Sequence, residues 1–421
     1  MADCVPYKSR SRTRILLAAA SLLALGALAI TPALAQHDAG PSLPPIPDMN
    51  QAEVDALIRD AGFTESKQTV KELVPGWNKP KMMLVHVDRP DRIAWLQKAV
   101  PDVKLVGVYQ TGTIEERQAE ALPYAAEADA FVSVLPNVLC DETVVRAATN
   151  LKWLHSFGAG VNDCIGVSPT VASGKFLLTN SQKIRSRPLA EDVFAMMVAL
   201  MRGIDLEARM DAGKRLVPPE WGERGMQMQG RTVLVVGLGG IGTEFAKMAH
   251  GIGMKVIATR ASSREGPDFV DYVGLADELP GLIGKADVVA MCAPLTSDTR
   301  GMFDTAMFNR MKRGAVFVNI SREDVAPKQD LLDALVSGQL GAAAMYANVG
   351  VPGERMPLTP DDPLWSAPNL LYTTHVMAPM RAVDEDTDGF WQRTWILTRE
   401  VMRRYASGDK MIAVVDVRRG Y

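Results

Sequence analysis

The strongest chemical signal in this sequence is a glycine-rich turn, Gly237-Leu238-Gly239-Gly240-Ile241-Gly242, which follows the apolar run Thr232–Val236 and precedes a helical pattern. In such a context Gly237 permits a tight turn, Gly239 lets the backbone approach a pyrophosphate, and Gly242 lets the helix pack on the strand. Free backbone N–H groups at the start of the helix then attract phosphate. The pattern predicts a dinucleotide-binding site that contains Gly237, Gly239, Gly240, Ile241 and Gly242.

The residues that end the next strand bear on the choice between NAD and NADP. An NAD site normally has Asp or Glu there, which accepts hydrogen bonds from the ribose hydroxyls. This chain has Arg260 at that position, with Ser262, Ser263 and Arg264 close behind it and no carboxylate. Guanidinium and hydroxyl donors suit an added 2′-phosphate. We therefore expect NADP, with NAD as the alternative if Arg260 only stacks on the adenine.

Two later strands end at residues that suit anion binding and proton transfer. Residues 315–322 end at Arg322, and residues 368–375 end at His375. Together with the glycine turn, these segments resemble the D-2-hydroxyacid dehydrogenase family. The likeness covers most of residues 81–421 and includes segments 152–161, 293–296, 362–365 and 414–421.

The resemblance implies a role for each of these residues in reducing a small 2-keto acid or oxidising a D-2-hydroxy acid. Arg322 would bind the substrate carboxylate and polarise the keto group. His375 would be the general acid or base, since imidazole titrates near operating pH. Backbone N–H groups of a loop would bind the carboxylate, and three further residues would contact the cofactor. The loop is Gly158, Ala159, Gly160 and Val161, and the cofactor residues are Ala293, Pro294 and Ile320.

The chain departs from the family where a glutamate normally pairs with the histidine and raises its pKa. Counting from either side puts Val351 or Met356 at that position, so Glu354 is the only nearby carboxylate that could serve. The family's aspartate after the preceding strand is Tyr346 here. We therefore expect activity biased toward lower pH than is usual in the family. A second hypothesis is a catalytically weakened nucleotide- or metabolite-binding protein of the same fold.

Apolar runs alternate with helical patterns through the body of the chain, which indicates parallel βαβ units. We expect an α/β protein with two doubly wound parallel-sheet domains, a Rossmann nucleotide domain and a flavodoxin-like substrate domain, and the active site in the cleft between them. Residues 81–187 and 378–421 would form the substrate domain, residues 188–377 the nucleotide domain, and residues 36–80 a linker and N-terminal extension. The expected strands are 82–87, 104–108, 130–134, 151–156, 176–179, 232–236, 255–259, 287–291, 315–320 and 342–346.

Composition supports a globular enzyme and argues against several other classes. The 421 residues are 47% hydrophobic and 23% charged, and the net charge of −3 gives no reason to expect nucleic-acid binding. The four cysteines cannot form a disulfide scaffold, and no CxxC pair suggests a metal site. An odd number remains beyond residue 35, so we expect Cys140, Cys164 and Cys292 to be free, buried thiols. Likeness to the family suggests a homodimer.

The first 35 residues have the pattern of a secretory signal peptide. Four basic residues lie within positions 8–14, an uncharged apolar run covers 15–30, and Ala33-Leu34-Ala35 provides a small-x-small cleavage site. At 1.5 Å per residue the apolar run reaches about 24 Å, short of the ~30 Å hydrocarbon core, so we expect no stable membrane span after cleavage. This predicts a periplasmic or secreted protein; translation from Met49 would instead leave it in the cytoplasm.

Overall fold

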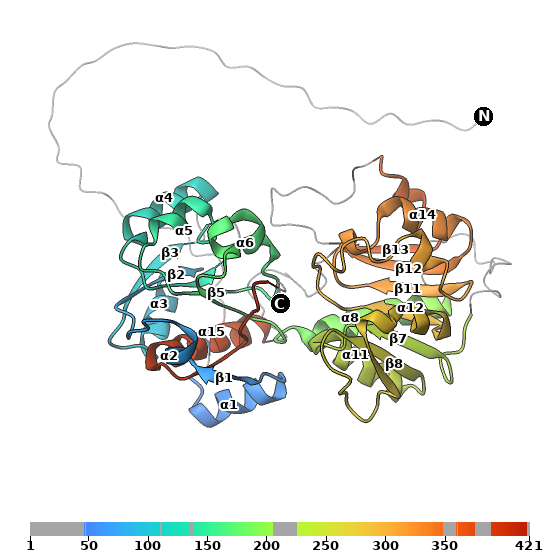
Figure 1. The fold of residues 1–421 in the computed structure, drawn as a ribbon, viewed down its shortest axis with the longest axis horizontal. Helices are drawn as coiled ribbons and strands as arrows, with labels where there is room; N and C mark the ends of the chain where they lie inside the picture. Colours follow the sequence, from blue (N-terminus) through green and yellow to red (C-terminus); the bar gives the residue numbers. More distant parts are fainter. Residues whose placement is uncertain are drawn as a thin grey trace, which may run out of the picture. The chain divides into compact units, whose positions relative to one another are not determined.

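The computed structural model describes residues 46, 48–109, 112–134, 138–204, 225–347, 359, 361–374 and 389–418. Two parallel sheets organise these residues, one of five strands and one of seven, and each sheet has its own helices (Figure 1). The inner strands of both sheets, such as β2, β5, β10 and β11, are buried on both faces, and this explains why they read in the sequence as continuous apolar runs.

The five-stranded sheet has the order β3-β2-β4-β5-β6, with all neighbours parallel. This order is that of a flavodoxin-like sheet. One face packs against α3 and α15, and the other packs against α4, α5 and α7. Its strands are β2 (Met82–Val87), β3 (Lys104–Tyr109), β4 (Ala130–Val134), β5 (Trp153–Ser156) and β6 (Leu177–Asn180). Its helices are α3 (Pro90–Gln97), α4 (Ile114–Ala125), α5 (Glu142–Ala147), α6 (Asn162–Val167), α7 (Pro169–Ala172) and α15 (Phe390–Ser407).

The seven-stranded sheet has the order β13-β12-β11-β10-β7-β8-β9 and is parallel throughout, which is the Rossmann order with one added strand. Helices α8 and α11 cover one face, and α12, α13 and α14 cover the other. The strands are β7 (Thr232–Val236), β8 (Lys255–Arg260), β9 (Tyr272–Leu275), β10 (Val288–Met291), β11 (Ala315–Asn319), β12 (Leu340–Ala347) and β13 (Leu370–Thr374). The helices are α8 (Ser186–Arg202), α11 (Gly240–Gly251), α12 (Leu279–Leu282), α13 (Thr305–Phe308) and α14 (Lys328–Val336), with 3₁₀ turns η1 (Ala276–Glu278), η2 (Ile283–Lys285), η3 (Glu323–Val325) and η4 (Pro363–Ser366).

The predicted fold class is therefore confirmed, and most strand bounds agree with the sequence pattern within two residues. Strand β9 was not predicted. It is only four residues long, and its exposed first residue, Tyr272, obscures the apolar pattern.

The N-terminal extension is better ordered than a linker. Helix α1 (Gln51–Asp60) begins at a capping box, in which Asn50 and Glu53 exchange side-chain and backbone hydrogen bonds. Strand β1 (Glu65–Thr69) then pairs antiparallel with β14 (Lys410–Ile412), and the short helix α2 (Val70–Leu73) follows it. This small sheet joins residues far apart in the chain and lies next to α15 in the same apolar core.

The expectation of three free cysteines is wrong for two of them. Cys140 and Cys164 form a disulfide, with their Cα atoms 5.1 Å apart. An odd count leaves at least one thiol unpaired, but it does not prevent the other two from pairing when the fold brings them together. Cys292 is the free thiol among the described cysteines, and desolvation raises its pKa.

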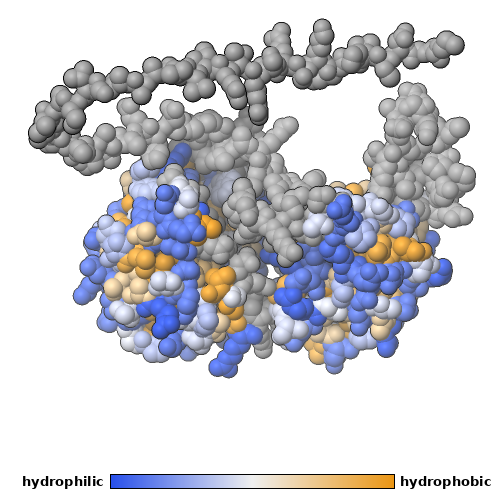
Figure 2. Space-filling view, turned by 90° about the horizontal axis from the view of Figure 1, so that it is seen from above, coloured by the Kyte–Doolittle hydropathy of each residue, from blue (hydrophilic) through white to orange (hydrophobic). Residues whose placement is uncertain are grey.

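The face seen in Figure 2 is largely hydrophilic, with apolar side chains in small separate groups. The exposed large apolar residues include Ile114, Leu122 and Tyr124 on α4 and Val336 at the end of α14. Within the ranges that the structure describes, no helix has both the length and the apolar content needed to cross a bilayer.

Candidate active site

The glycine turn has the geometry that a dinucleotide requires. Gly237 follows β7 with φ +97°, and a Cβ there would lie 2.6 Å from the backbone nitrogen of Ala293. A Cβ on Gly242 would collide with the carbonyl oxygen of Gly237. By contrast, a Cβ on Gly239 would meet nothing within 4 Å, so open space lies beside the first turn of α11. These residues fit a pyrophosphate bound at the helix N-terminus.

Basic and hydroxyl side chains gather at the end of β8. Arg260 is half-buried, and its Nη1 donates to the carbonyl oxygen of Glu265 at 2.8 Å. The side chain of Ser262 is exposed. Arg264 is less available, because its guanidinium pairs with Glu278 at 2.6 Å and contacts Tyr272. Arg260 and Ser262 are thus the better placed donors for a phosphate at this strand end.

Arg322 stands where β11 has just ended, at the carboxyl edge of the sheet. Its Nη1 donates to the carbonyl oxygen of Ser321 at 2.8 Å. The side chain of Asn319 fixes this turn, since its Nδ2 donates to the Arg322 carbonyl and its Oδ1 accepts from the Ser321 N–H. The guanidinium points at the predicted substrate loop, because a Cβ on Gly160 would lie 3.0 Å from Nη2 of Arg322. The structure therefore brings together the predicted cation and the predicted loop.

The substrate loop itself is exposed at Gly158, Ala159 and Gly160 and anchored from beneath. Nδ2 of the buried Asn180, at the end of β6, donates to the carbonyl oxygen of Ala159 at 2.5 Å. The N–H of Ser181 donates to the carbonyl oxygen of Gly158 at 3.1 Å. Because Asn180 and Ser181 bind these two carbonyls, the loop can present backbone N–H groups toward a bound anion.

The disulfide lies close to the same loop along the chain. Cys164 is in α6, whose N-cap is Val161, the last residue of the loop. Cys140 lies in the turn before α5, and both cysteines are at most 2% exposed. The bond therefore fastens the helix that follows the substrate loop to a neighbouring turn.

The remaining predicted cofactor residues occupy the same region of the nucleotide domain. Ala293 lies against Gly237, Pro294 is exposed beside it, and Ile320 is buried just beyond β11. His375 and Glu354 lie outside the described residues. The described part of β13 ends at Thr374, one residue before His375.

Tyr346, which replaces the family's aspartate, is buried at the end of β12. Its hydroxyl donates to Oδ2 of Asp192 on α8 at 3.3 Å. Desolvation raises the pKa of Asp192, and the Tyr346 hydrogen bond and the Arg185 charge oppose that rise. A carboxylate is therefore present at this strand end after all, but a helix supplies it.

Sequence reasoning missed Asn180, Ser181, Asp192 and the cysteine pair. A signal for the first two was present, because Thr179-Asn180-Ser181 places polar residues directly after an apolar strand at the edge where ligands bind. Asp192 and the cysteine pair had no such signal, since their partners are distant in the sequence.

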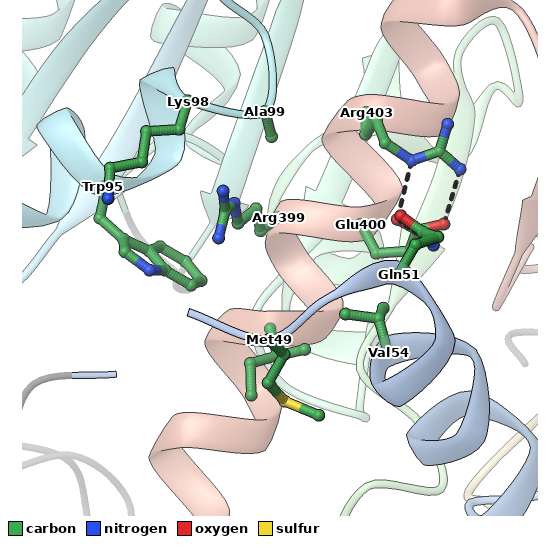
Figure 3. A pocket seen from close by; sticks show the side chains of 10 residues that line it. Met49, Gln51, Val54, Trp95, Lys98, Ala99, Arg399, Glu400 and Arg403 are labelled. Atoms are coloured by element: carbon green, nitrogen blue, oxygen red, sulfur yellow. Dashed lines mark hydrogen bonds and ion pairs between the residues drawn. The ribbon is translucent and has the colours of Figure 1, made fainter. Parts of the chain in front are cut away.

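A separate hollow lies between α1, α3 and α15 (Figure 3). Its charged side chains are already paired, Lys98 and Arg399 with Asp48, and Arg403 with Glu400. We assign it to packing of the N-terminal extension on α15. Among the described residues, no group of three or more His, Cys, Asp or Glu side chains is placed to hold a metal ion.

Comparison with known proteins agrees with this geometry. The model of the "D-isomer specific 2-hydroxyacid dehydrogenase, NAD binding domain" matches residues 194–377. A glyoxylate reductase from Korarchaeum cryptofilum is 31% identical over 254 residues, which cover 59% of this chain and 73% of that protein. The chain belongs to the D-isomer specific 2-hydroxyacid dehydrogenase family. The predicted family and the predicted class of NAD(P)-dependent oxidoreductase are therefore confirmed.

Two further relatives show how far this membership reaches. A D-3-phosphoglycerate dehydrogenase from Archaeoglobus fulgidus is 28% identical over 250 residues, which cover 57% of this chain but only 44% of that relative. The solved structure of an NADPH-dependent glyoxylate/hydroxypyruvate reductase from Sinorhizobium meliloti, in complex with NADP and sulfate, has a TM-score of 0.59 and 24% identity, and the match covers 81% of this chain and all of that one. The dehydrogenase fold is thus shared well beyond close sequence similarity.

Proposed function

We propose that this dehydrogenase-family chain is an NADP(H)-dependent reductase of small 2-keto acids that also oxidises the corresponding D-2-hydroxy acids. The observation that carries the proposal is the approach of the Arg322 guanidinium to the loop at Gly160. A small carboxylate bound there would meet a cation on one side and backbone N–H groups on the other. The glyoxylate reductase among the relatives supports a substrate of this size.

Several residues of the chain would each have a separate role in the reduction of the keto acid. Arg322 forms two parallel hydrogen bonds with the substrate carboxylate. Its positive charge also polarises the keto group and stabilises the negative charge that develops on the keto oxygen during reduction. Loop residues 158–161 orient the carboxylate. His375, directly after β13, gives the proton to the keto oxygen and takes it back in the reverse direction. The bound nicotinamide supplies the hydride.

NADP is proposed over NAD because Arg260 and Ser262 stand where an NAD site has a carboxylate. Arg260 makes no ion pair among the described residues, so its charge is available to a 2′-phosphate. The NADP complex of the Sinorhizobium meliloti reductase, which has the same fold, supports this choice.

Export through the N-terminal signal peptide is proposed for the location. The Cys140–Cys164 disulfide supports it, because disulfides persist mainly in oxidising compartments outside the cytosol. A homodimer is proposed separately, from likeness to the family. Mass spectrometry of protein purified from the expressing cells tests the export proposal, since cleavage after Ala35 gives a chain that begins at Gln36. A mass corresponding to a chain that starts at Met1 or Met49 would contradict it.

The activity is tested by following NADPH and NADH oxidation by the mature protein with glyoxylate, hydroxypyruvate and phenylpyruvate across pH. We expect turnover with NADPH and a loss of at least about 100-fold in kcat/KM for Arg322→Ala, since a charge-assisted bidentate contact is lost. Arg300→Ala is the control, because Arg300 is exposed and its ion-pair partner among the described residues is Asp324. Undiminished turnover in Arg322→Ala would refute the assigned role.

The second hypothesis, a catalytically weakened binding protein, has one observation in its favour. The position of the family's aspartate is taken by the buried Tyr346, which makes no ionic contribution of its own. Tight NADPH binding without turnover of any of the three keto acids would establish this alternative.

A further inference from the structure

Lys183 is a cation that lies beside the glycine turn but is not part of the glycine motif. It lies in the segment between β6 and α8, and its Cγ would be 3.3 Å from a Cβ on Gly240. Ser186 fills the rest of that space, so no larger side chain fits at position 240. The stem of Lys183 therefore lies over the first turn of α11, where a pyrophosphate is expected.

The backbone at Lys183 is held in a conformation that lysine seldom adopts. Its φ is +71°, and the other described non-glycine residues with a positive φ are Asn369 at +55° and Ala413 at +57°. Glycine would take this conformation without a steric penalty. Residues retained in such a conformation often serve a site, and at Lys183 the side chain reaches the glycine turn.

The positive charges of Lys183 and Arg260 favour a bound anion beside the glycine turn. Burial lowers the pKa of Lys183, and the positive charge of Arg260 lowers it further. Its ammonium donates to the carbonyl oxygen of Gly62 and lies 5.8 Å from the centre of the Phe63 ring, both in the loop after α1. An ammonium has three donors, so this bond leaves others for a ligand. The N-terminal extension thus holds Lys183 beside the turn.

We propose that Lys183 binds a phosphate of the dinucleotide and is positioned for it by the carbonyl of Gly62. This inference rests on the proposed NADP(H) dependence. Two phosphates of the cofactor share the required chemistry. The pyrophosphate would bind at the N-terminus of α11 in either cofactor, whereas a 2′-phosphate that could bind beside Arg260 exists only in NADPH.

Equilibrium titration of the mature protein with NADPH and with NADH, followed by nucleotide fluorescence, tests the proposal without requiring turnover. Lys183→Gln should weaken binding by about tenfold or more, since a charge-assisted hydrogen bond is lost, and Lys183→Arg should restore much of it. Equal weakening for both cofactors assigns the pyrophosphate, and weakening for NADPH alone assigns the 2′-phosphate. Lys67→Gln, at an exposed lysine on β1, is the control for general charge.

A second variant separates binding from folding. Lys183→Gly removes the side chain and relieves the backbone, so the melting temperature should hold while nucleotide affinity falls. Ala413→Gly relieves a similar backbone just after β14 and should leave nucleotide affinity unchanged. Wild-type affinity for both cofactors in Lys183→Gln would overturn the proposal. If the wild-type protein binds neither dinucleotide, the proposed function fails as well.

Discussion

Asn180 is the side chain on which the shape of the substrate loop most depends. Its amide donates to the carbonyl oxygen of Ala159, and its Oδ1 accepts from the N–H of Gln182. Asn180→Ala would release the loop and leave buried groups without partners, which costs about 1–3 kcal/mol. We expect KM for the keto acid to rise by about tenfold while NADPH affinity is retained. Steady-state kinetics with a separate nucleotide titration measure this.

The control for that variant is Asn150→Ala. Asn150 makes the same kind of bond, from its side-chain amide to the carbonyl of Ala126, but at an exposed site outside the loop. An unchanged KM in Asn180→Ala would mean that the loop keeps its shape without this anchor.

Individual residues were predictable where one local pattern fixes their role. Gly237, Gly239 and Gly242 follow from backbone geometry that the strand–turn–helix context dictates. Lys183 and Asp192 were not predictable, because each acts on a partner that the fold, not the sequence, brings near. Tyr346 illustrates the same limit, since its substitution for an acid was visible but the replacement carboxylate on α8 was not.

At the scale of elements, the disulfide joins α6 to the turn before α5 and should stabilise the substrate domain. The bond closes a loop of 24 residues, for which restriction of the unfolded chain contributes about 3 kcal/mol. Cys140→Ser should therefore lower the free energy of unfolding by about that amount. Urea unfolding measures it, with Cys292→Ser as the control because that thiol is unpaired.

Loss of the disulfide should affect substrate binding but not nucleotide binding. Because α6 follows directly from the substrate loop, Cys140→Ser should raise KM for the keto acid and leave NADPH affinity unchanged. Equal stability of the oxidised protein and the Cys140→Ser variant would show that the bond constrains nothing, and a free-thiol count of three in the mature protein would show that it does not form.

Elements were predictable to the degree that burial imposed a pattern on them. Strands such as β2, buried on both faces, gave apolar runs with clear bounds. Strand β1 reads Glu-Ser-Lys-Gln-Thr and is largely exposed, so nothing local marks it as a strand. It exists because β14, more than 300 residues later, supplies its hydrogen-bond partners.

For the whole molecule, two buried histidines make stability depend on pH. His86 lies on β2 and His155 on β5, and neither side chain is exposed. Burial lowers the pKa of His86 to about 4, with a smaller contribution from the charge of Arg117, and lowers the pKa of His155 to about 3. Hydrogen bonds with Thr179 and Thr398 engage both ring nitrogens of His155, whereas the ring nitrogens of His86 have no partner among the described residues.

The direction of this pH dependence follows from the protonation of the two histidines in the folded and unfolded states. Above pH 6.5 both histidines are neutral in both states, so they impose no penalty. Below it the unfolded chain binds protons that the folded chain excludes, and the free energy of unfolding falls by about 1.4 kcal/mol per pH unit for each histidine. Carboxylates with lowered pKa, such as Glu400, begin to contribute only below about pH 4.5. Between about pH 6.5 and 4.5, the two histidines are therefore the groups that lower the free energy of unfolding.

We expect the free energy of unfolding to be about 4 kcal/mol lower at about pH 5 than at pH 7, measured by urea unfolding. His86→Leu should halve that dependence and raise stability at acid pH, because an apolar side chain of similar volume replaces a buried ring with unsatisfied nitrogens. His250→Leu, at an exposed histidine on α11, should leave the dependence as it is. A slope between pH 6.5 and 4.5 that His86→Leu does not change would mean that His86 is protonated, or reaches water, in the folded protein.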